Sequence, residues 1–229
     1  MKVCYFCGEI ANSKEHLPPK QIFKGFRLNR ITVPSCDKHN TSKSGEDEAI
    51  IKAMLLSIEN SDNKKLSPEL IKALNIVKRH YSQVKKTVTK EKVYSDYNKN
   101  IVCLNSSIDL SHWIKELSAG MIYYKTEYFD HKNDFLKSIV FERNSYSKNT
   151  TLKLIDFENE RKNKIKLQNL FENFIWNASW LPQNIYPKNL YYFEYTFMNE
   201  KILIKHVFYK SYTYYNMIKI TEETRKKLY

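Results

Sequence analysis

Residues 4–19 read CYFCGEIANSKEHLPP, and residues 31–43 read ITVPSCDKHNTSK. Each stretch holds one pair of potential metal ligands two residues apart: Cys4 and Cys7, then Cys36 and His39. This spacing lets a tight turn direct both side chains of a pair at one ion, and Zn²⁺ takes four such ligands in a tetrahedron. The sequence therefore predicts a structural zinc site with no open position for water. The alternative interpretation is free thiols beside a surface histidine.

Cysteine usage fits a reducing compartment. The sequence has 4 cysteines in 229 residues, and close pairs in a cytoplasmic protein are typical of metal ligands rather than disulfides. Cys103 stands alone in an apolar stretch, without an activating neighbour, and is predicted to be a buried core thiol. Residues 1–20 lack the apolar run of a signal peptide, and no stretch approaches the roughly 18 apolar residues of a membrane span. We therefore expect a cytoplasmic protein with no membrane partner.

The charge of the chain favours a polyanionic partner. Lysine and arginine number 38 against 25 aspartate and glutamate, a net charge of +13. Residues 1–60 hold 9 of these basic and 7 of these acidic side chains, which leaves 29 against 18, or +11, for residues 61–229. Nucleic acid is the commonest polyanion in cells. Because an A/T-rich coding bias also enriches lysine, the charge is supporting evidence only.

The sequence divides at the polar stretch NSDNKKLSPE, residues 60–69, into regions 1–60 and 61–229. Apolar residues recur at helical spacing after Asn40, after Ser67 and after Asp109, and the last two are predicted N-caps. A further helix is expected within residues 154–176.

Strands are predicted mainly near the C-terminus. Residues 190–210 read LYYFEYTFMNEKILIKHVFYK, which alternates around a polar turn as in a β-hairpin. Residues 87–95 and 140–145 are weaker strand candidates. The aromatic rings of the hairpin are expected to pack in the sheet and core rather than to stack on bases. The predicted fold class is α+β, with mixed helices and antiparallel strands in the C-terminal region.

A short motif lies between the two ligand pairs. It reads Glu15-His16-Leu17-Pro18-Pro19, Asn40 directly follows the last ligand, and Lys43 comes three residues later. In this order the constellation resembles the HNH endonucleases, the ββα-metal nucleases, in their zinc-stapled form. The resemblance covers about residues 1–50. It implies an N-terminal ββα module in which a hairpin and a helix frame one Mg²⁺ or Mn²⁺ beside the structural zinc.

The resemblance also assigns roles to residues. His16 would be the general base that takes a proton from water, a task that suits its pKa. Asn40 and Glu15 would hold the divalent ion through oxygen atoms, with Glu15 directed to the opposite side of the strand from His16. Lys43 would contact substrate. The ion would stabilise charge on the departing 3′ oxygen. The expected activity is hydrolysis of phosphodiester bonds, with DNA expected ahead of RNA, and by analogy alone a role in restriction or phage defence.

Three departures from the family pattern bear on these roles. Glu15 stands where aspartate is usual, so ligation would need a shifted geometry. His39 replaces a cysteine, which zinc accepts. The middle asparagine of the family, which braces the loop between the strands, falls near Ile31, and Asn29 is close but out of register.

Other interpretations stay open. Asp47 and Glu48 are expected to form a solvated helix face, or else a water-mediated contact to the ion. A zinc-stapled nucleic-acid-binding module with a decayed nuclease site, or a protein-interaction module on a zinc ribbon, would share the fold. Residues 61–229 are expected to bind the substrate, a partner protein or a second copy of the chain, or to sense a ligand.

Overall fold

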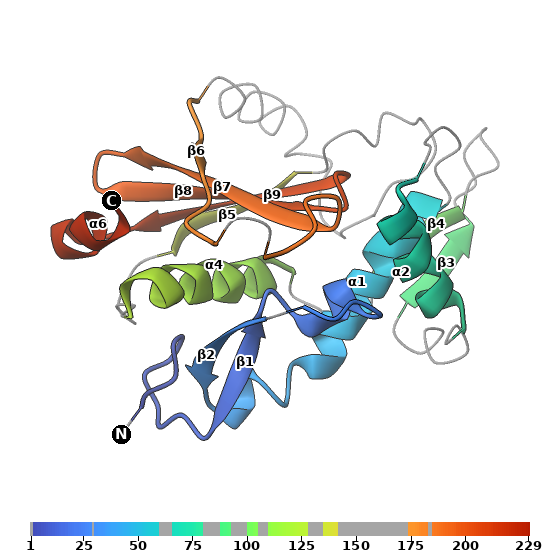
Figure 1. Ribbon diagram of the computed structural model, residues 1–229, viewed down its shortest axis with the longest axis horizontal. Coiled ribbons are helices and arrows are strands. Elements are labelled where there is room, and N and C mark those ends of the chain that lie inside the picture. Colours follow the sequence, from blue (N-terminus) through green and yellow to red (C-terminus); the bar gives the residue numbers. More distant parts are fainter. Residues whose placement is uncertain are drawn as a thin grey trace.

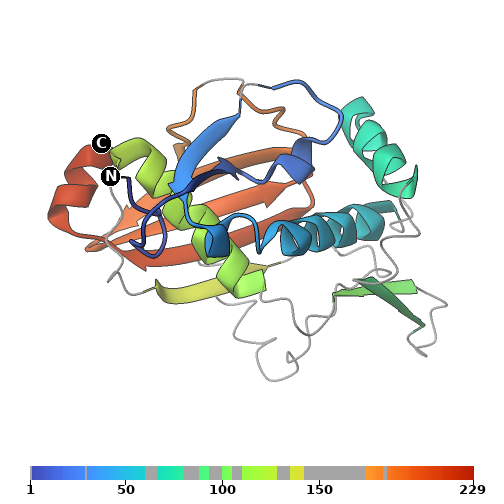
Figure 2. The same ribbon diagram turned by 90° about the horizontal axis from the view of Figure 1, so that it is seen from below.

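The computed structural model describes residues 2–28, 30–59, 66–79, 88–92, 100–104, 110–127, 135–141, 174–182 and 185–229. Helix α4 (Leu110–Thr126) lies in the middle of the molecule. A five-stranded sheet covers one side of α4, and the hairpin of β1 (Ser13–Leu17) and β2 (Ile31–Ser35) covers the other (Figure 1). Seen from below, the hairpin crosses α4 with the sheet behind it (Figure 2).

The two strands of the first hairpin pair antiparallel, from Ser13 opposite Ser35 to Leu17 opposite Ile31. Side chains alternate between the faces of a strand. Glu15 and Leu17 are accordingly buried against α4, whereas His16 is half-buried on the outer face. Two short 3₁₀ helices follow the strands, η1 (Lys20–Phe23) and η2 (Asp37–His39).

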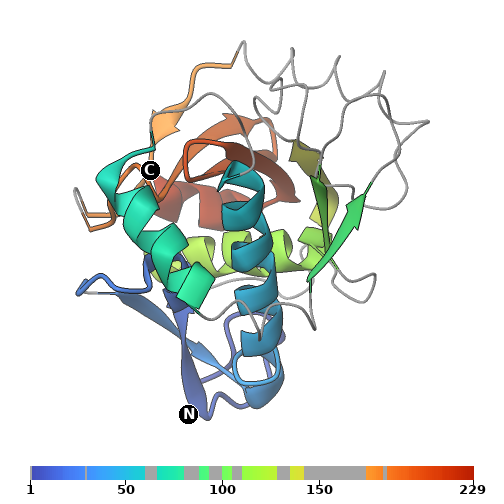
Figure 3. The ribbon, with the colours of Figure 1, turned by 90° about the vertical axis from the view of Figure 1, so that its right-hand side faces the viewer.

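Helix α1 (Ser44–Glu59) and helix α2 (Pro68–Arg79) pack against each other, as the view from the right shows (Figure 3). The predicted cap of α2 is confirmed, because Ser67 Oγ accepts a hydrogen bond of 3.3 Å from the Leu70 amide. The predicted apolar stripe of α1 is buried over its described side chains: Ile50, Ile51, Met54 and Leu55. Ile71 of α2 is exposed, whereas Leu70 and Leu74 of the same helix are buried.

The large sheet has the order β5-β9-β8-β7-β6, and all its neighbours are antiparallel. Its strands are β5 (Phe135–Phe141), β6 (Asn177–Ala178), β7 (Tyr191–Met198), β8 (Lys201–Phe208) and β9 (Tyr212–Lys219). The hairpin predicted within residues 190–210 is confirmed as β7 and β8. Tyr191, Phe193 and Phe208 of that hairpin are buried, so these rings belong to the core. The chain ends in α6 (Glu222–Leu228), capped by Thr221.

A separate two-stranded sheet pairs β3 (Val88–Lys92) with β4 (Asn100–Leu104), which confirms the weaker strand predicted in residues 87–95. The other weak strand candidate, residues 140–145, overlaps a strand only at Val140 and Phe141, because β5 ends at Phe141. Cys103 lies on β4, but its side chain is outside the described part of the structure, as are Asp109 and most of residues 154–176.

One hydrophobic cluster joins the elements from both sides of residue 60. It includes Leu17 of β1, Trp113 of α4 and Tyr214 of β9, so α4 and the large sheet share a core with the first hairpin. The fold class is α+β, as predicted. Among the described residues no helix is both long enough and apolar enough to cross a bilayer.

Candidate metal centre and active site

The four predicted zinc ligands come together. Their ligand atoms all lie within 4.8 Å of one another: Cys4 Sγ, Cys7 Sγ, Cys36 Sγ and His39 Nδ1. Cys7 Sγ is 3.7 Å from Cys36 Sγ, and His39 Nδ1 is 3.7 Å from Cys4 Sγ and 3.2 Å from Cys36 Sγ. A tetrahedron with Zn–S bonds of about 2.3 Å separates its sulfur atoms by about 3.8 Å. The cluster could therefore bind a metal ion such as zinc.

Local backbone geometry explains how each pair forms. The first pair lies on a turn closed by the Gly8 amide, which donates to the Cys4 carbonyl at 3.1 Å. Gly8 has φ 79°, a left-handed conformation that glycine adopts without steric strain. The second pair lies where β2 runs into η2, and the His39 amide donates to the Cys36 carbonyl at 3.1 Å.

The pKa shifts of Cys4 and His39 favour the forms that bind a metal, whereas burial raises the pKa of the Cys7 thiol to about 12. Burial alone would raise the pKa of the Cys4 thiol, but backbone N–H groups of Cys7, Phe6 and Cys36 more than offset it, and the pKa is lowered. Thiolate is the form that binds zinc. Burial lowers the pKa of His39, which favours the neutral imidazole that a metal requires.

Glu116 on α4 connects this cluster to the rest of the core. Its Oε1 lies 3.8 Å from His39 Nε2 and 3.5 Å from His112 Nε2, and its Oε2 lies 3.0 Å from Lys43 Nζ. A carboxylate on the far nitrogen of a ligating histidine fixes the orientation of the ring. Glu116 is therefore placed to orient His39 toward the three sulfur atoms. The sequence pattern did not single out this residue.

The side chains of Glu15 and Lys43 face the interior. Glu15 is 3% exposed, Lys43 is 7% exposed, and the two form an ion pair. Burial raises the pKa of Glu15 to about 7, although Lys43 opposes this shift. Burial would lower the pKa of Lys43, but the charges of Glu15, Glu116 and Asp47 raise it. One buried ammonium group thus pairs with Glu15 and Glu116 and interacts electrostatically with Asp47.

These placements do not fit two of the predicted roles. Lys43 is held inside by two carboxylates, so its ammonium group cannot reach a phosphate outside the fold. Glu15 gives its carboxylate to Lys43 on the face of β1 opposite His16. A magnesium ligand needs oxygen atoms directed at the same ion as its neighbours. Because the Glu15 carboxylate is buried and paired with Lys43, it does not fit the expected role of sharing a substrate-accessible ion with Asn40.

His16 is the outward partner of Glu15 on β1. Its Nδ1 is buried and has no hydrogen-bond partner among the described residues. Burial lowers the pKa of His16, and the positive charges of Arg30 and Lys20 lower it further. At neutral pH the imidazole is therefore mostly unprotonated and able to accept a proton. Arg30 is two residues from Thr32, which pairs with His16, so it follows on the same face of the hairpin.

Asn40 follows η2 and reaches back to β1. Its Nδ2 donates to Ser13 Oγ at 3.0 Å and to the Lys14 carbonyl at 3.2 Å. These two bonds use the amide nitrogen, so Oδ1 takes no part in them. The oxygen that the resemblance assigns to a metal is thus left for another partner, next to the backbone of β1.

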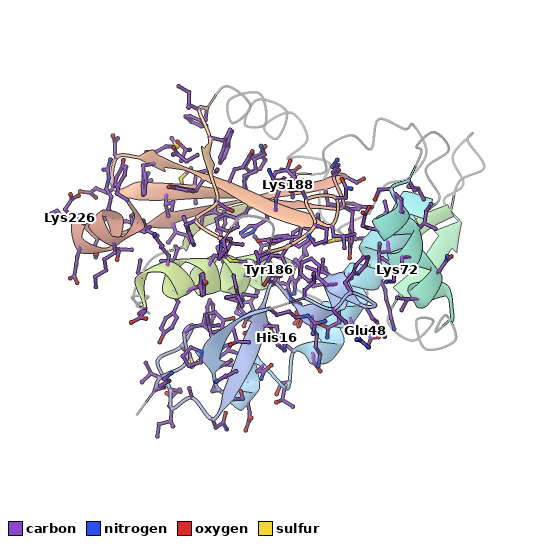
Figure 4. The ribbon with its side chains drawn as sticks, in the orientation of Figure 1. His16, Glu48, Lys72, Tyr186, Lys188 and Lys226 are labelled. Atoms are coloured by element: carbon purple, nitrogen blue, oxygen red, sulfur yellow. The ribbon has the colours of Figure 1, made fainter. Side chains whose placement is uncertain are left out.

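The remaining acidic candidates differ from each other. Asp47 is not part of a solvated face: it is 6% exposed and accepts a hydrogen bond of 2.6 Å from Trp113 Nε1. Glu48 does face solvent, where it pairs with Lys52 at 2.8 Å and Lys24 at 3.8 Å (Figure 4). Asn29, the candidate for the missing brace, lies outside the described residues.

Comparison with known proteins adds no family to this description. The sequence matches no protein-family model, and neither curated proteins nor solved structures give a match. The functional argument therefore depends on the residues of this chain.

Proposed function

We propose that this protein is an HNH-type nuclease that hydrolyses phosphodiester bonds of nucleic acid, DNA ahead of RNA, with His16 as its general base. The observation that supports this most is the state of His16. Its imidazole is half-buried, has a lowered pKa and is not committed to another side chain. It stands on the outer face of a hairpin, and the Cys3His cluster brings the turn that precedes β1 to the segment that follows β2.

The chemistry follows from these features. The neutral imidazole takes a proton from a water molecule, and the resulting hydroxide attacks phosphorus. The bond from phosphorus to the 3′ oxygen then breaks, and that oxygen leaves with the electron pair. Arg30 and Lys20 supply positive charge beside His16, which attracts the phosphate anion to the base.

The Cys3His cluster would have a structural role in this scheme. Four protein ligands complete the tetrahedral coordination of a zinc ion and leave no coordination position for substrate. The resemblance also implies Mg²⁺ or Mn²⁺, and Asn40 Oδ1 is the described oxygen with the best placement for it. Because Glu15 does not fit as a second ligand, we assign no step of the reaction to this ion.

A second candidate function is nucleic-acid binding without cleavage. Two observations favour it: Glu15 is committed to Lys43, and Ile31 stands near the position of the brace that the family uses. The net charge of +13 would serve binding equally well. The two functions differ only in what happens to the bound strand.

A cleavage assay separates the two functions. The protein and its His16→Ala variant are incubated with supercoiled plasmid, single-stranded DNA and RNA, each with Mg²⁺, Mn²⁺ or EDTA. The nuclease proposal expects cutting by the parent, and a loss of roughly 10²- to 10⁴-fold in the variant, with zinc content and melting temperature retained. Equal cutting by the variant would refute the role of His16. Binding without cutting under every condition would establish the second function.

A further inference from the structure

The open end of the first hairpin is closed by a side chain from a distant part of the sequence. The Tyr186 hydroxyl donates a hydrogen bond of 2.6 Å to the Leu17 carbonyl and accepts one of 3.0 Å from the Ile31 amide. Leu17 and Ile31 are the last paired residues of β1 and β2. One phenol oxygen therefore connects the two strands directly after His16.

Burial and ring packing hold the Tyr186 side chain in this position. It is 6% exposed, and its ring stacks on Phe23 of η1 with centroids 4.5 Å apart and planes at 7°. Burial raises the pKa of Tyr186 to about 12, so the hydroxyl keeps its proton and can donate and accept at once. The hydroxyl of a neutral tyrosine can donate to a carbonyl and accept from an amide at the same time.

The sequence after β1 explains why the hairpin needs this group. Pro18 and Pro19 have no N–H, so β1 cannot continue its ladder of hydrogen bonds beyond Leu17. Leu17 and Ile31 are 0% and 5% exposed, which keeps solvent from their backbone groups. A buried carbonyl or amide without a partner is costly. Tyr186 satisfies both groups and fixes the distance between the strands.

We propose that Tyr186 is a positioning residue for His16, holding the end of the hairpin in the geometry that the base requires. Leu17 is covalently next to His16, and Ile31 is covalently next to Arg30, so both outer-face groups depend on the strand ends that Tyr186 joins. Figure 4 shows Tyr186 and His16 near the same end of β1. The C-terminal region would thus supply the brace that Ile31 cannot. This inference rests on the proposed role of His16.

The test compares two single-hydroxyl deletions. Tyr186→Phe removes the brace and keeps the ring on Phe23. Tyr191→Phe is the matched control, because Tyr191 is also buried and its hydroxyl makes one core hydrogen bond, of 2.9 Å to His206 Nδ1. We expect Tyr186→Phe to lower kcat roughly tenfold to a hundredfold with KM and zinc content unchanged, since small misplacements of a base are expensive. The control should keep the parent kcat.

A readout without cleavage keeps this inference separate from the proposed function. NMR would follow amide exchange at Ile31 and the position of the His16 imidazole signals in both variants. Faster exchange and shifted His16 signals in Tyr186→Phe alone would support positioning, even if the parent cuts nothing and the proposed function fails. Unchanged His16 signals in Tyr186→Phe, or the same kcat in both variants of an active enzyme, would overturn it.

Discussion

The Cys3His cluster and the predicted catalytic residues Glu15, His16 and Asn40 lie on or next to the same hairpin. Different features of the sequence determine where the two groups of side chains lie. Each pair of potential metal ligands forms within one turn, at Cys4–Gly8 and at Cys36–His39, so local spacing determines it. Glu15 and His16 do not converge in the same way, because on β1 Glu15 faces α4 and His16 faces away from it. The comparison teaches that turn geometry can be inferred from spacing, whereas the function of a strand residue depends on what covers its face.

The largest expected effect concerns the cluster. Cys4→Ser should lose the metal and unfold the first hairpin, since metal binding in small sites contributes about 10–16 kcal/mol in peptide models. Zinc content by mass spectrometry of the native protein, together with thermal unfolding, measures this. Cys103→Ser is the matched control and should keep one metal per chain. A Cys4→Ser protein with the melting temperature of the parent would contradict a structural metal.

The next largest effect is expected for the buried ion pairs on the inner face of β1, the face that carries Glu15. Lys43→Met would leave Glu15, Glu116 and Asp47 without their counter-ion, and breaking a buried ion pair costs about 3–5 kcal/mol. Lys24→Met is the control, because Lys24 is 49% exposed and its pair with Glu48 is 3.8 Å long, so about 1 kcal/mol or less is expected. Urea unfolding measures both changes. Equal losses of unfolding free energy in the two variants would show that the buried ion pairs of Lys43 contribute no more than the exposed pair of Lys24.

The pH dependence of stability tests the buried carboxylates Glu15 and Asp47, which interact with Lys43. The folded-state pKa of Glu15 is raised from 4.5 to about 7, and that of Asp47 from 3.8 to about 6. The folded protein therefore binds more protons than the unfolded chain in this window, and the free energy of unfolding falls as pH rises through it. Glu15→Gln should lose less stability than the parent between pH 5 and 7. Parallel curves for the two proteins would contradict the raised pKa of Glu15.

The smallest effect concerns the contact of β1 with α4. A Cβ at Gly120 would lie 2.5 Å from Leu17 Cδ1, so Gly120→Ala should overpack this contact and cost about 1–3 kcal/mol. Gly45 has open space around it, and Gly45→Ala in α1 should instead stabilise by up to about 1 kcal/mol. Thermal unfolding gives the sign of each change. A stabilising Gly120→Ala would show that the hairpin does not depend on this close approach.

Much of the fold could be predicted from the sequence. The spacing of ligands gave the metal cluster, helical periodicity gave most of α1 and α4, and alternation gave the hairpin of β7 and β8. A signal for the inward side of Glu15 was also present, because Leu17 is apolar and lies two residues away on the same face. The expectation already placed Glu15 and His16 on opposite sides of the strand, but nothing in this alternation indicated that Lys43 would lie on the inner side and pair with Glu15.

The partners of these side chains could not be predicted in this way. Glu116 is 73 residues from Lys43, and Tyr186 is 155 residues from Ile31. Such contacts depend on how α4 and the segment before β7 pack on the hairpin. Neither periodicity nor spacing carries this information.

The central claim is that His16 acts as a base, and chemical rescue tests it most directly. The measurement is the single-turnover rate of cleavage by His16→Ala, with and without imidazole in the buffer, beside the parent over pH 5–8. The account predicts that imidazole restores part of the rate. It also predicts a half-maximal parent rate below pH 6.5, because burial, Arg30 and Lys20 lower the pKa of His16. A variant that cuts like the parent, or a parent rate that falls as pH rises, would contradict the account.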